Sequence, residues 1–211
     1  MFEAYLLTLF GVMAAQASPG PNLIAVASVS LAQGRKAGLA VVTGVSSGML
    51  VWSLATAYGL ATVLEFFPWS LTAMRIVGGG YLLWLAFKGF RAAICNEPGA
   101  IRPTRNRFTP TQAWLRGFLV LLTNPKAVMM WAAVATFLFG AGLEPWQVFL
   151  FGPICALSGF AIYGTYAVLF STGLASRTYQ RFSRWFETLF SAAFGALGGK
   201  LLYDGVRELR P

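Results

Sequence analysis

The hydrophobic positions of the chain gather in six long apolar runs, which are separated by short stretches rich in arginine and lysine. The runs lie near residues 5–32, 38–63, 72–90, 117–140, 146–173 and 187–206. A helix needs about 20 mostly apolar residues to cross the hydrocarbon core of a bilayer, and each run supplies that length. The pattern therefore predicts an all-α membrane protein in which six transmembrane helices form a single transmembrane domain over residues 1–211.

Two of the six runs contain strong helix breakers. Residues 4–34 hold no charge, and as one straight helix they would extend over about 46 Å, well beyond the roughly 30 Å of hydrocarbon. Residues 18–22 of this run read SPGPN, and residues 123–126 of the fourth run read TNPK. Because proline removes a helical hydrogen bond and glycine has a low helix propensity, we expect the first and fourth helices to be broken.

The two breaks occupy matching positions of an internal repeat. Gly11 precedes Pro19 by eight residues, and Gly117 precedes Pro125 by eight. The third run ends in LAFKGFR and the sixth in LLYDGVR, so the order of the matches is the same in both halves. Three helices in each half is an odd number, which would invert the second half relative to the first, as in many secondary transporters. The sequence thus predicts two inverted three-helix repeats, 1–91 and 116–211, joined by a linker over 92–115.

The composition excludes a soluble domain, since 57% of the residues are hydrophobic and 11% are charged, whereas soluble domains carry roughly 25% charged residues. The net charge of +9 lies mainly in the short stretches between apolar runs, where basic residues orient membrane helices, so we predict no nucleic-acid partner. One set of loops holds eleven basic residues and the opposite set holds four. The positive-inside rule places the richer set in the cytoplasm and both termini outside. That richer set comprises Arg35, Lys36, Lys88, Arg91, Arg102, Arg105, Arg107, Arg116, Arg177, Arg181 and Arg184.

Broken backbone at membrane depth is tolerated only where protein buries it or where it lines a watery cavity. In transporters, breaks at corresponding positions of the two halves form the substrate site. The helix that restarts after each break presents free amides with positive dipole character, and these suit a substrate carboxylate. The predicted substrate-binding residues are Pro19, Gly20, Pro21, Asn22, Asn124, Pro125 and Lys126, with Gln16 and Ser47 as further candidates.

Lys126 is an ionisable residue near the predicted bilayer centre, since it follows Arg116 by ten residues, or about 15 Å of helix. It could pair with an anion or release its proton, so it is the first candidate for ion coupling. The alternative is that both motifs are plain proline kinks and that Lys126 snorkels to the cytoplasmic face. Lys200 and Asp204, four residues apart, are a second coupling candidate or an ordinary interfacial pair. The chain has no histidine, and we predict no metal and no other cofactor.

Three stretches resemble the lysine-exporter (LysE/RhtB) family of bacterial amino-acid efflux transporters. They read SPGPNLIAVASVSLAQGRKAGLAVVTGVSSGMLVW, VGGGYLLWLAFKGFR and GFLVLLTNPKAVMMW, and the resemblance extends in order along the whole chain. It implies a small six-helix, multi-pass protein of the bacterial inner membrane that exports amino acids, driven by proton or ion gradients. Many relatives carry an acidic residue directly after the position of Gly48, where this chain has Met49. Its absence argues against a cationic substrate, and the chain looks nearest to the threonine/homoserine branch.

The combined prediction is a secondary-active efflux transporter for small neutral amino acids, threonine-like or homoserine-like, and not an enzyme. Export of other amino acids and a passive channel are the alternatives. A membrane thiol oxidoreductase would need paired cysteines, and Cys95 and Cys155 lie far apart and form no CxxC motif. The predicted partners are the amino-acid substrate and membrane lipid, and a homodimer is left open.

Overall fold

A computed structural model describes residues 2–67, 69–95, 101–172 and 174–209, apart from the side chains of residues 61, 64, 92, 95, 174–184, 186 and 187. Within these ranges every regular element is a helix, which confirms the predicted all-α class. The elements are α1 (Phe2–Ala17), α2 (Pro21–Leu54), the π-helix η1 (Ala55–Leu60), α3 (Ala61–Phe66), α4 (Ser70–Cys95), α5 (Pro110–Leu122), α6 (Pro125–Gly140), α7 (Pro145–Ser171) and α8 (Leu174–Glu208).

Both predicted helix breaks are present. The first separates α1 from α2 at residues 18–20, and the second separates α5 from α6, which meet at an angle of 58°. Pro21 and Pro125 open the helices that follow the breaks, where the missing amide hydrogen costs no helical bond. The Asn124 side chain caps α6 by accepting a hydrogen bond from the amide of Lys126 at 3.0 Å.

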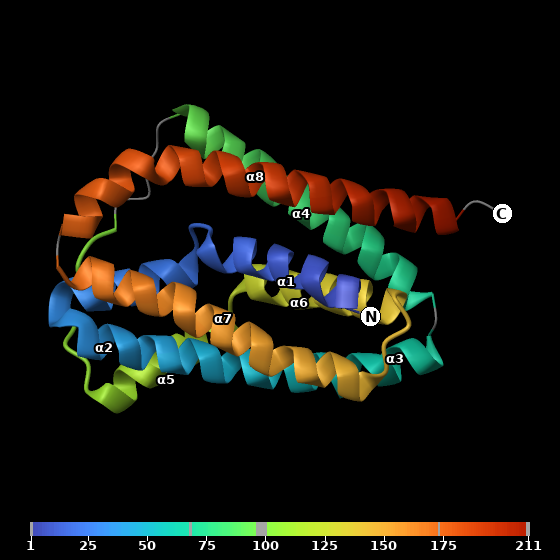
Figure 1. Cartoon of the computed structure of the whole chain (residues 1–211), viewed down its shortest axis with the longest axis horizontal. Helices are drawn as coiled ribbons and strands as arrows, with labels where there is room; N and C mark the ends of the chain where they lie inside the picture. The colour runs from blue at the N-terminus through green and yellow to red at the C-terminus, as the bar shows by residue number, and fades with distance from the viewer. Residues whose placement is uncertain (1, 68, 96–100, 173, 210–211) are drawn as a thin grey trace.

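A sharp turn at Gly34 divides α2 into two helices. Gly34 has φ 80° and ψ 179°, a left-handed value that glycine adopts without steric cost. In Figure 1 the ribbon of α2 runs to the left end of the molecule, turns there, and returns along the lower edge. The turn carries Arg35 and Lys36, and it separates the first predicted apolar run from the second. The starting end of α1 and the final turns of α8 lie toward the opposite end of the molecule (Figure 1).

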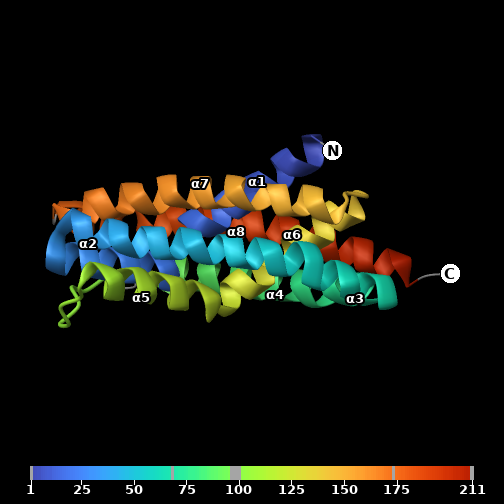
Figure 2. The same ribbon diagram turned by 90° about the horizontal axis from the view of Figure 1, so that it is seen from below.

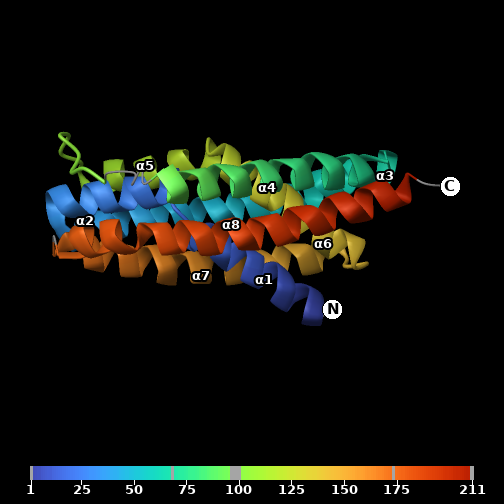
Figure 3. The same ribbon diagram turned by 90° about the horizontal axis from the view of Figure 1, so that it is seen from above.

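The helices form two layers with α1 and α6 between them (Figure 1). α4 and α8 make one layer, which faces the viewer in Figure 3, and α2, α5 and α7 make the other, which faces the viewer in Figure 2. The largest helix–helix interfaces join α2 to α7, α2 to α5, and α4 to α8. The core is divided in the same way. A large apolar cluster fills the α2–α5–α7 side, and a smaller one around Leu82, Phe190 and Leu201 fills the α4–α8 side.

Glycines permit the closest helix contacts. A Cβ atom at Gly44 would overlap the Trp114 carbonyl oxygen of α5, and one at Gly117 would overlap the Val41 carbonyl oxygen of α2. Between α4 and α8, a Cβ at Gly79 would lie 2.9 Å from the carbonyl oxygen of Gly198, and the reciprocal distance is 2.8 Å. The α2–α5 and α4–α8 pairs therefore pack backbone against backbone.

The outer faces of the helices are apolar. Phe2, Phe66, Ile94, Leu157 and Trp185 each expose 71% or more of their accessible surface. Monomeric soluble proteins rarely expose large contiguous apolar patches, so these faces suit contact with lipid. By length and composition Pro21–Leu60, Ser70–Arg91 and Pro145–Ser171 can cross a membrane, and the bent α5–α6 pair adds a fourth span.

The six-helix arrangement as inverted repeats stays a prediction. The helix boundaries differ from the predicted runs in two places. The linker expected over 92–115 is shorter, since α4 continues to Cys95 and α5 begins at Pro110. The sixth helix is longer than the run 187–206, since α8 extends from Leu174 to Glu208 and so includes a polar first part.

Candidate functional site

The two helix breaks meet inside the bundle. Asn124 Nδ2 donates a hydrogen bond to Asn22 Oδ1 at 3.2 Å, across 102 residues of sequence. Asn22 Nδ2 in turn donates to the Tyr163 hydroxyl of α7 at 3.3 Å. Both asparagines are buried, with exposed fractions of 7% for Asn22 and 4% for Asn124. The chain of bonds fixes both breaks against α7.

Lys126 lies against the backbone that the first break releases. Its Nζ donates to the Ser18 hydroxyl, and it lies 3.5 Å from the carbonyl oxygens of Ser18 and Pro19. The same Nζ lies 5.5 Å from the centre of the Phe194 ring, and a Cβ atom at Gly20 would come within 3.5 Å of it. The ammonium group of Lys126 is thus held between the first break and α8.

Gln16 occupies the last turn of α1 and is 2% exposed. Its Nε2 donates to the Cys155 carbonyl oxygen at 3.0 Å, and its Oε1 accepts from the Ser158 hydroxyl at 3.0 Å. The Tyr166 hydroxyl donates to the carbonyl oxygen of Ala17 at 2.9 Å. α7 therefore satisfies the buried Gln16 amide, and Tyr166 satisfies a carbonyl oxygen that the end of α1 leaves without a helical partner.

A cavity of about 20 Å³ lies between the breaks. That volume holds roughly one water molecule, so the cavity between the breaks is too small for an amino acid in this arrangement. The polar lining comes from Gln16, Ser18, Asn22, Asn124, Lys126 and Tyr163. On the other side of the broken segment a larger cavity of about 320 Å³ reaches Pro19, Pro125 and Lys126. Lys126 borders both cavities.

Most of the residues predicted for the site come together, and a few do not. Ser47 lies in the α2–α5 interface, where its hydroxyl donates to the Thr43 carbonyl oxygen at 2.8 Å and accepts from the Trp114 indole at 3.4 Å. Lys200 and Asp204 line a separate cavity near the ends of α1, α6 and α8. Within the part of the chain that the structure describes no ion pair joins them, and Lys200 Nζ lies 5.6 Å from the centre of the Phe137 ring.

Sequence reasoning missed Ser18, Ser158 and Tyr163 as partners in the site. Ser18 stands within the SPGPN motif, so its place beside the break was available from the sequence. Ser158 and Tyr163 stand in α7 at positions that parallel Ser47 and Trp52 of the first half in the predicted repeat. The internal repeat could have identified these two residues of α7, because residues at corresponding positions of the two halves are candidates for lining the same cavity.

Comparison with known proteins finds a family and several relatives. The sequence matches the family described as LysE type translocator over residues 13–205. It is 28% identical over 189 residues to the threonine efflux protein of Escherichia coli, and the aligned region covers 88% of this chain and 90% of that protein. It is 32% identical over 130 residues to the leucine efflux protein of Klebsiella pneumoniae, covering 61% and 60%. The homoserine/homoserine lactone efflux protein of Salmonella typhimurium is 28% identical over 189 residues, covering 85% and 84%.

No solved structure matches this chain. The family match confirms the resemblance that the sequence motifs carry, and it includes both helix breaks. Together with the apolar helices it confirms a multi-pass protein of the bacterial inner membrane.

Proposed function

Because this chain belongs to the LysE type translocator family, we propose that it is a secondary-active exporter of small neutral amino acids, threonine-like or homoserine-like, and that the cavity between the helix breaks is its substrate site. The observation that carries this proposal is the Asn124–Asn22 hydrogen bond, which joins the two breaks beside the Lys126 ammonium group. The relatives are named as efflux proteins for threonine, leucine and homoserine, and these names support amino-acid efflux.

The contacts of Lys126 suggest how a zwitterion is recognised. In the closed site the ammonium group of Lys126 lies against the oxygens of Ser18 and Pro19. A substrate amino acid brings its own ammonium group for those oxygens and a carboxylate for Lys126. Charge-assisted hydrogen bonds of this kind are roughly twice as strong as neutral ones. The amides at the start of α2 add positive dipole character on the carboxylate side.

The lining of the cavity favours a neutral side chain. Met49, Leu121 and Met130 form its apolar wall, and the described lining includes no aspartate or glutamate. A cationic side chain would therefore be buried without a counter-charge, which is costly in an apolar environment. A hydroxyl has partners within reach in the asparagine pair and the Tyr163 hydroxyl.

Export against a gradient needs a coupled ion, and Lys126 is the coupling group of the proposal. It is the one basic side chain in the described lining of the cavity, and it contacts groups of both α1–α2 and α8. Exchange of a proton at Lys126 for the substrate would link the two movements. Cys155, of the thiol alternative considered from the sequence, is buried in α7, and the side chain of Cys95 lies outside the described residues.

Export from proteoliposomes tests the proposal. Labelled threonine, homoserine, leucine and lysine are compared with and without an imposed proton gradient. We expect concentrative movement of the small neutral amino acids that a protonophore abolishes. Lys126→Ala should abolish it, while Lys36→Ala, which removes an equal charge from the exposed turn after Gly34, should not. Movement that persists at full rate without a gradient would support a passive channel instead, and full activity of Lys126→Ala would remove Lys126 from the mechanism.

A further inference from the structure

Three cavities follow one another along the groove between the α4–α8 layer and the α1–α6 pair. The first, of about 320 Å³, begins at the broken segment and is walled by Tyr81, Trp84 and Phe190. Lys88 stands at its border. This is the end of α4 that leads toward the arginine-rich stretch after it. Its aromatic walls and its contact with Lys126 place it next to the substrate site.

The second cavity is a narrow passage of about 40 Å³. It starts at Lys126 and Phe194, which also border the first cavity, and it ends at Thr8 and Phe137, which also border the third. Apart from Lys126 and Thr8, the residues that line it are apolar or glycine. An apolar constriction of this size stops a zwitterion, because charged groups cannot enter it without polar partners.

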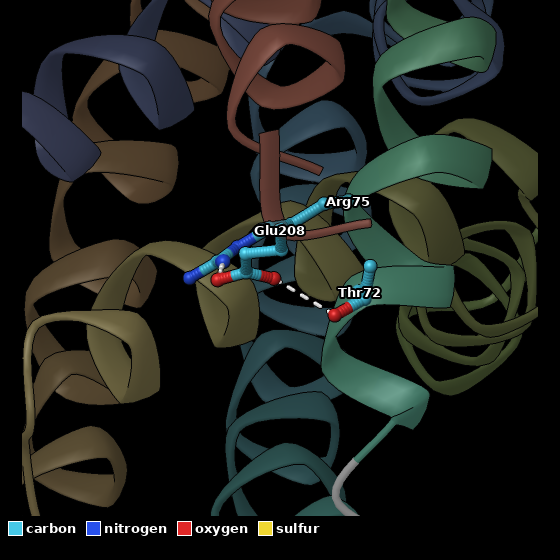
Figure 4. A network of polar contacts seen from close by, with 3 residues as sticks. All are labelled: Thr72, Arg75 and Glu208. Carbon is cyan, nitrogen blue, oxygen red and sulfur yellow. Dashed lines mark hydrogen bonds and ion pairs between the residues drawn. The ribbon is translucent and has the colours of Figure 1, made fainter. Parts of the chain in front are cut away.

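The third cavity, of about 310 Å³, lies at the opposite end of the passage. Glu3, Lys200 and Asp204 place carboxylates and an ammonium group on its wall. Arg75 also borders it and is engaged in an ion pair with Glu208, which accepts from the Thr72 hydroxyl at 2.8 Å (Figure 4). Since Lys200 and Asp204 are not joined in the described structure, each can meet a group of opposite charge within the cavity.

We propose that these three cavities are the export route and that the third is an exit-side amino-acid site. Lys200 takes the carboxylate of the released zwitterion, and Asp204 takes its ammonium group. The apolar passage is the closed gate between this site and the broken-helix site. The inference rests on the proposed function, and it adds a second site and the path that joins the two.

Gly11 offers a direct test of the route. It lines the passage, and a Cβ atom there would lie 3.0 Å from Leu197 Cδ1, so Gly11→Leu should plug it. Gly80→Leu is the matched control, because Gly80 is exposed on α4 with no atom within 4 Å of its Cβ position. We expect Gly11→Leu to reduce export from proteoliposomes to the background rate while the thermal stabilisation by threonine is kept. Gly80→Leu should export like the parent.

Chemical labelling of the folded protein tests the same route if Gly11→Leu does not fold. Thr8→Cys, in a chain whose native cysteines are replaced by serine, places a thiol where the passage meets the third cavity. A membrane-impermeant thiol reagent should then stop export, whereas Trp146→Cys, exposed at the start of α7, should be labelled without effect. Full export by Gly11→Leu, or by labelled Thr8→Cys, would overturn the route.

The exit site has its own readout. Lys200→Gln and Asp204→Asn should weaken the inhibition of export by threonine added on the exit side and leave the substrate dependence on the loading side unchanged. Lys36→Gln is the control for loss of one positive charge. Unchanged inhibition in both variants would overturn the exit site while leaving the route in place. A parent protein that neither exports threonine nor is stabilised by it would instead refute the proposed function, and the exit site with it.

Discussion

The hydrogen bond between Asn22 and Asn124 makes a quantitative prediction, because it is the link between the two halves of the site. Asn124→Ala removes that bond, at 3.2 Å, and the cap on the Lys126 amide, at 3.0 Å. Loss of an N-cap costs about 1 kcal/mol, and loss of a neutral hydrogen bond costs about 1 kcal/mol. We therefore expect Asn124→Ala to lower the free energy of unfolding by about 2 kcal/mol or more, since the buried Asn22 oxygen is left without this partner.

The double mutant separates the shared bond from the other losses. Asn22→Ala removes the same bond and the one to the Tyr163 hydroxyl. Because the double variant loses the shared bond only once, its destabilisation should fall short of the sum of the single variants by about 1 kcal/mol. Reversible unfolding of purified protein in detergent measures the four free energies. Asn106→Ala, in the exposed segment before α5, is the control and should leave stability unchanged.

If the losses of unfolding free energy in the two single variants were additive, the hydrogen bond between Asn22 and Asn124 would be refuted. If the two single losses sum to the double loss within about 0.3 kcal/mol, the side chains do not interact, as is usual for distant sites. The two breaks would then lie apart in the protein, and a common substrate site between them would lose its structural basis. Substrate-induced stabilisation, measured on the same four proteins, would show whether the weaker binding expected for each variant follows the loss of the bond.

Two further predictions concern the breaks and the packing. Replacing residues 19–21 together by alanine should let α1 continue into α2, since alanine is the best helix former. The protein should still insert but should lose threonine-induced stabilisation, and retained stabilisation would show that the break is only a kink. Gly44→Ala should lower stability by about 1–3 kcal/mol, because its Cβ would overlap the α5 backbone. Gly199→Ala, with no atom within 4 Å, should be neutral or stabilising by up to about 1 kcal/mol, and equal effects in thermal unfolding would argue against the close α2–α5 contact.

Local sequence predicted the features that depend on local chemistry. The apolar runs, the breaks at SPGPN and TNPK, and the reversal near Arg35 all follow from hydrophobicity, proline, glycine and charge. The π-helix η1 at Ala55–Leu60 was not predicted, and nothing in its local sequence explains it.

Local sequence patterns did not predict which residues of different helices contact one another. Lys200 and Asp204 have the spacing of an i, i+4 pair, yet Lys200 packs over Phe137 of α6 because another helix lies within reach. Ser47 shares a small-residue stretch with Gly48, but the close approach that this stretch permits turns it toward the Trp114 indole and away from the cavity. Which side of a helix faces the protein interior depends on the neighbouring helices. In an almost wholly apolar helix the periodicity of the sequence does not identify that side.

The packing of the two layers bears on how the proposed route opens. Glycine contacts lock α2 to α5 and α4 to α8, so each of these pairs moves most easily as a unit, while the cavities lie between the α4–α8 layer and the α1–α6 pair. Rocking of one packed unit against another around a fixed site is the usual form of alternating access. A cross-link between the α4–α8 layer and the α1–α6 pair should therefore stop export, and one within the α4–α8 layer should not.

Arg75 and Gly140 allow this to be tested at the outer end of the groove. A Cβ atom at Gly140 of α6 would lie 2.9 Å from Arg75 Nη2, so the extended Arg75 side chain spans the gap between α4 and α6 at this point. A bifunctional reagent about as long as that side chain can therefore join Arg75→Cys to Gly140→Cys in a cysteine-free background. Thr72→Cys with Glu208→Cys is the matched pair, because these residues touch within the α4–α8 layer (Figure 4). We expect the first cross-link to abolish export from proteoliposomes and the second to leave it intact. If export survives the first cross-link, the α4–α8 layer does not move against α6 during transport, and the passage must open by rearrangement of its side chains alone.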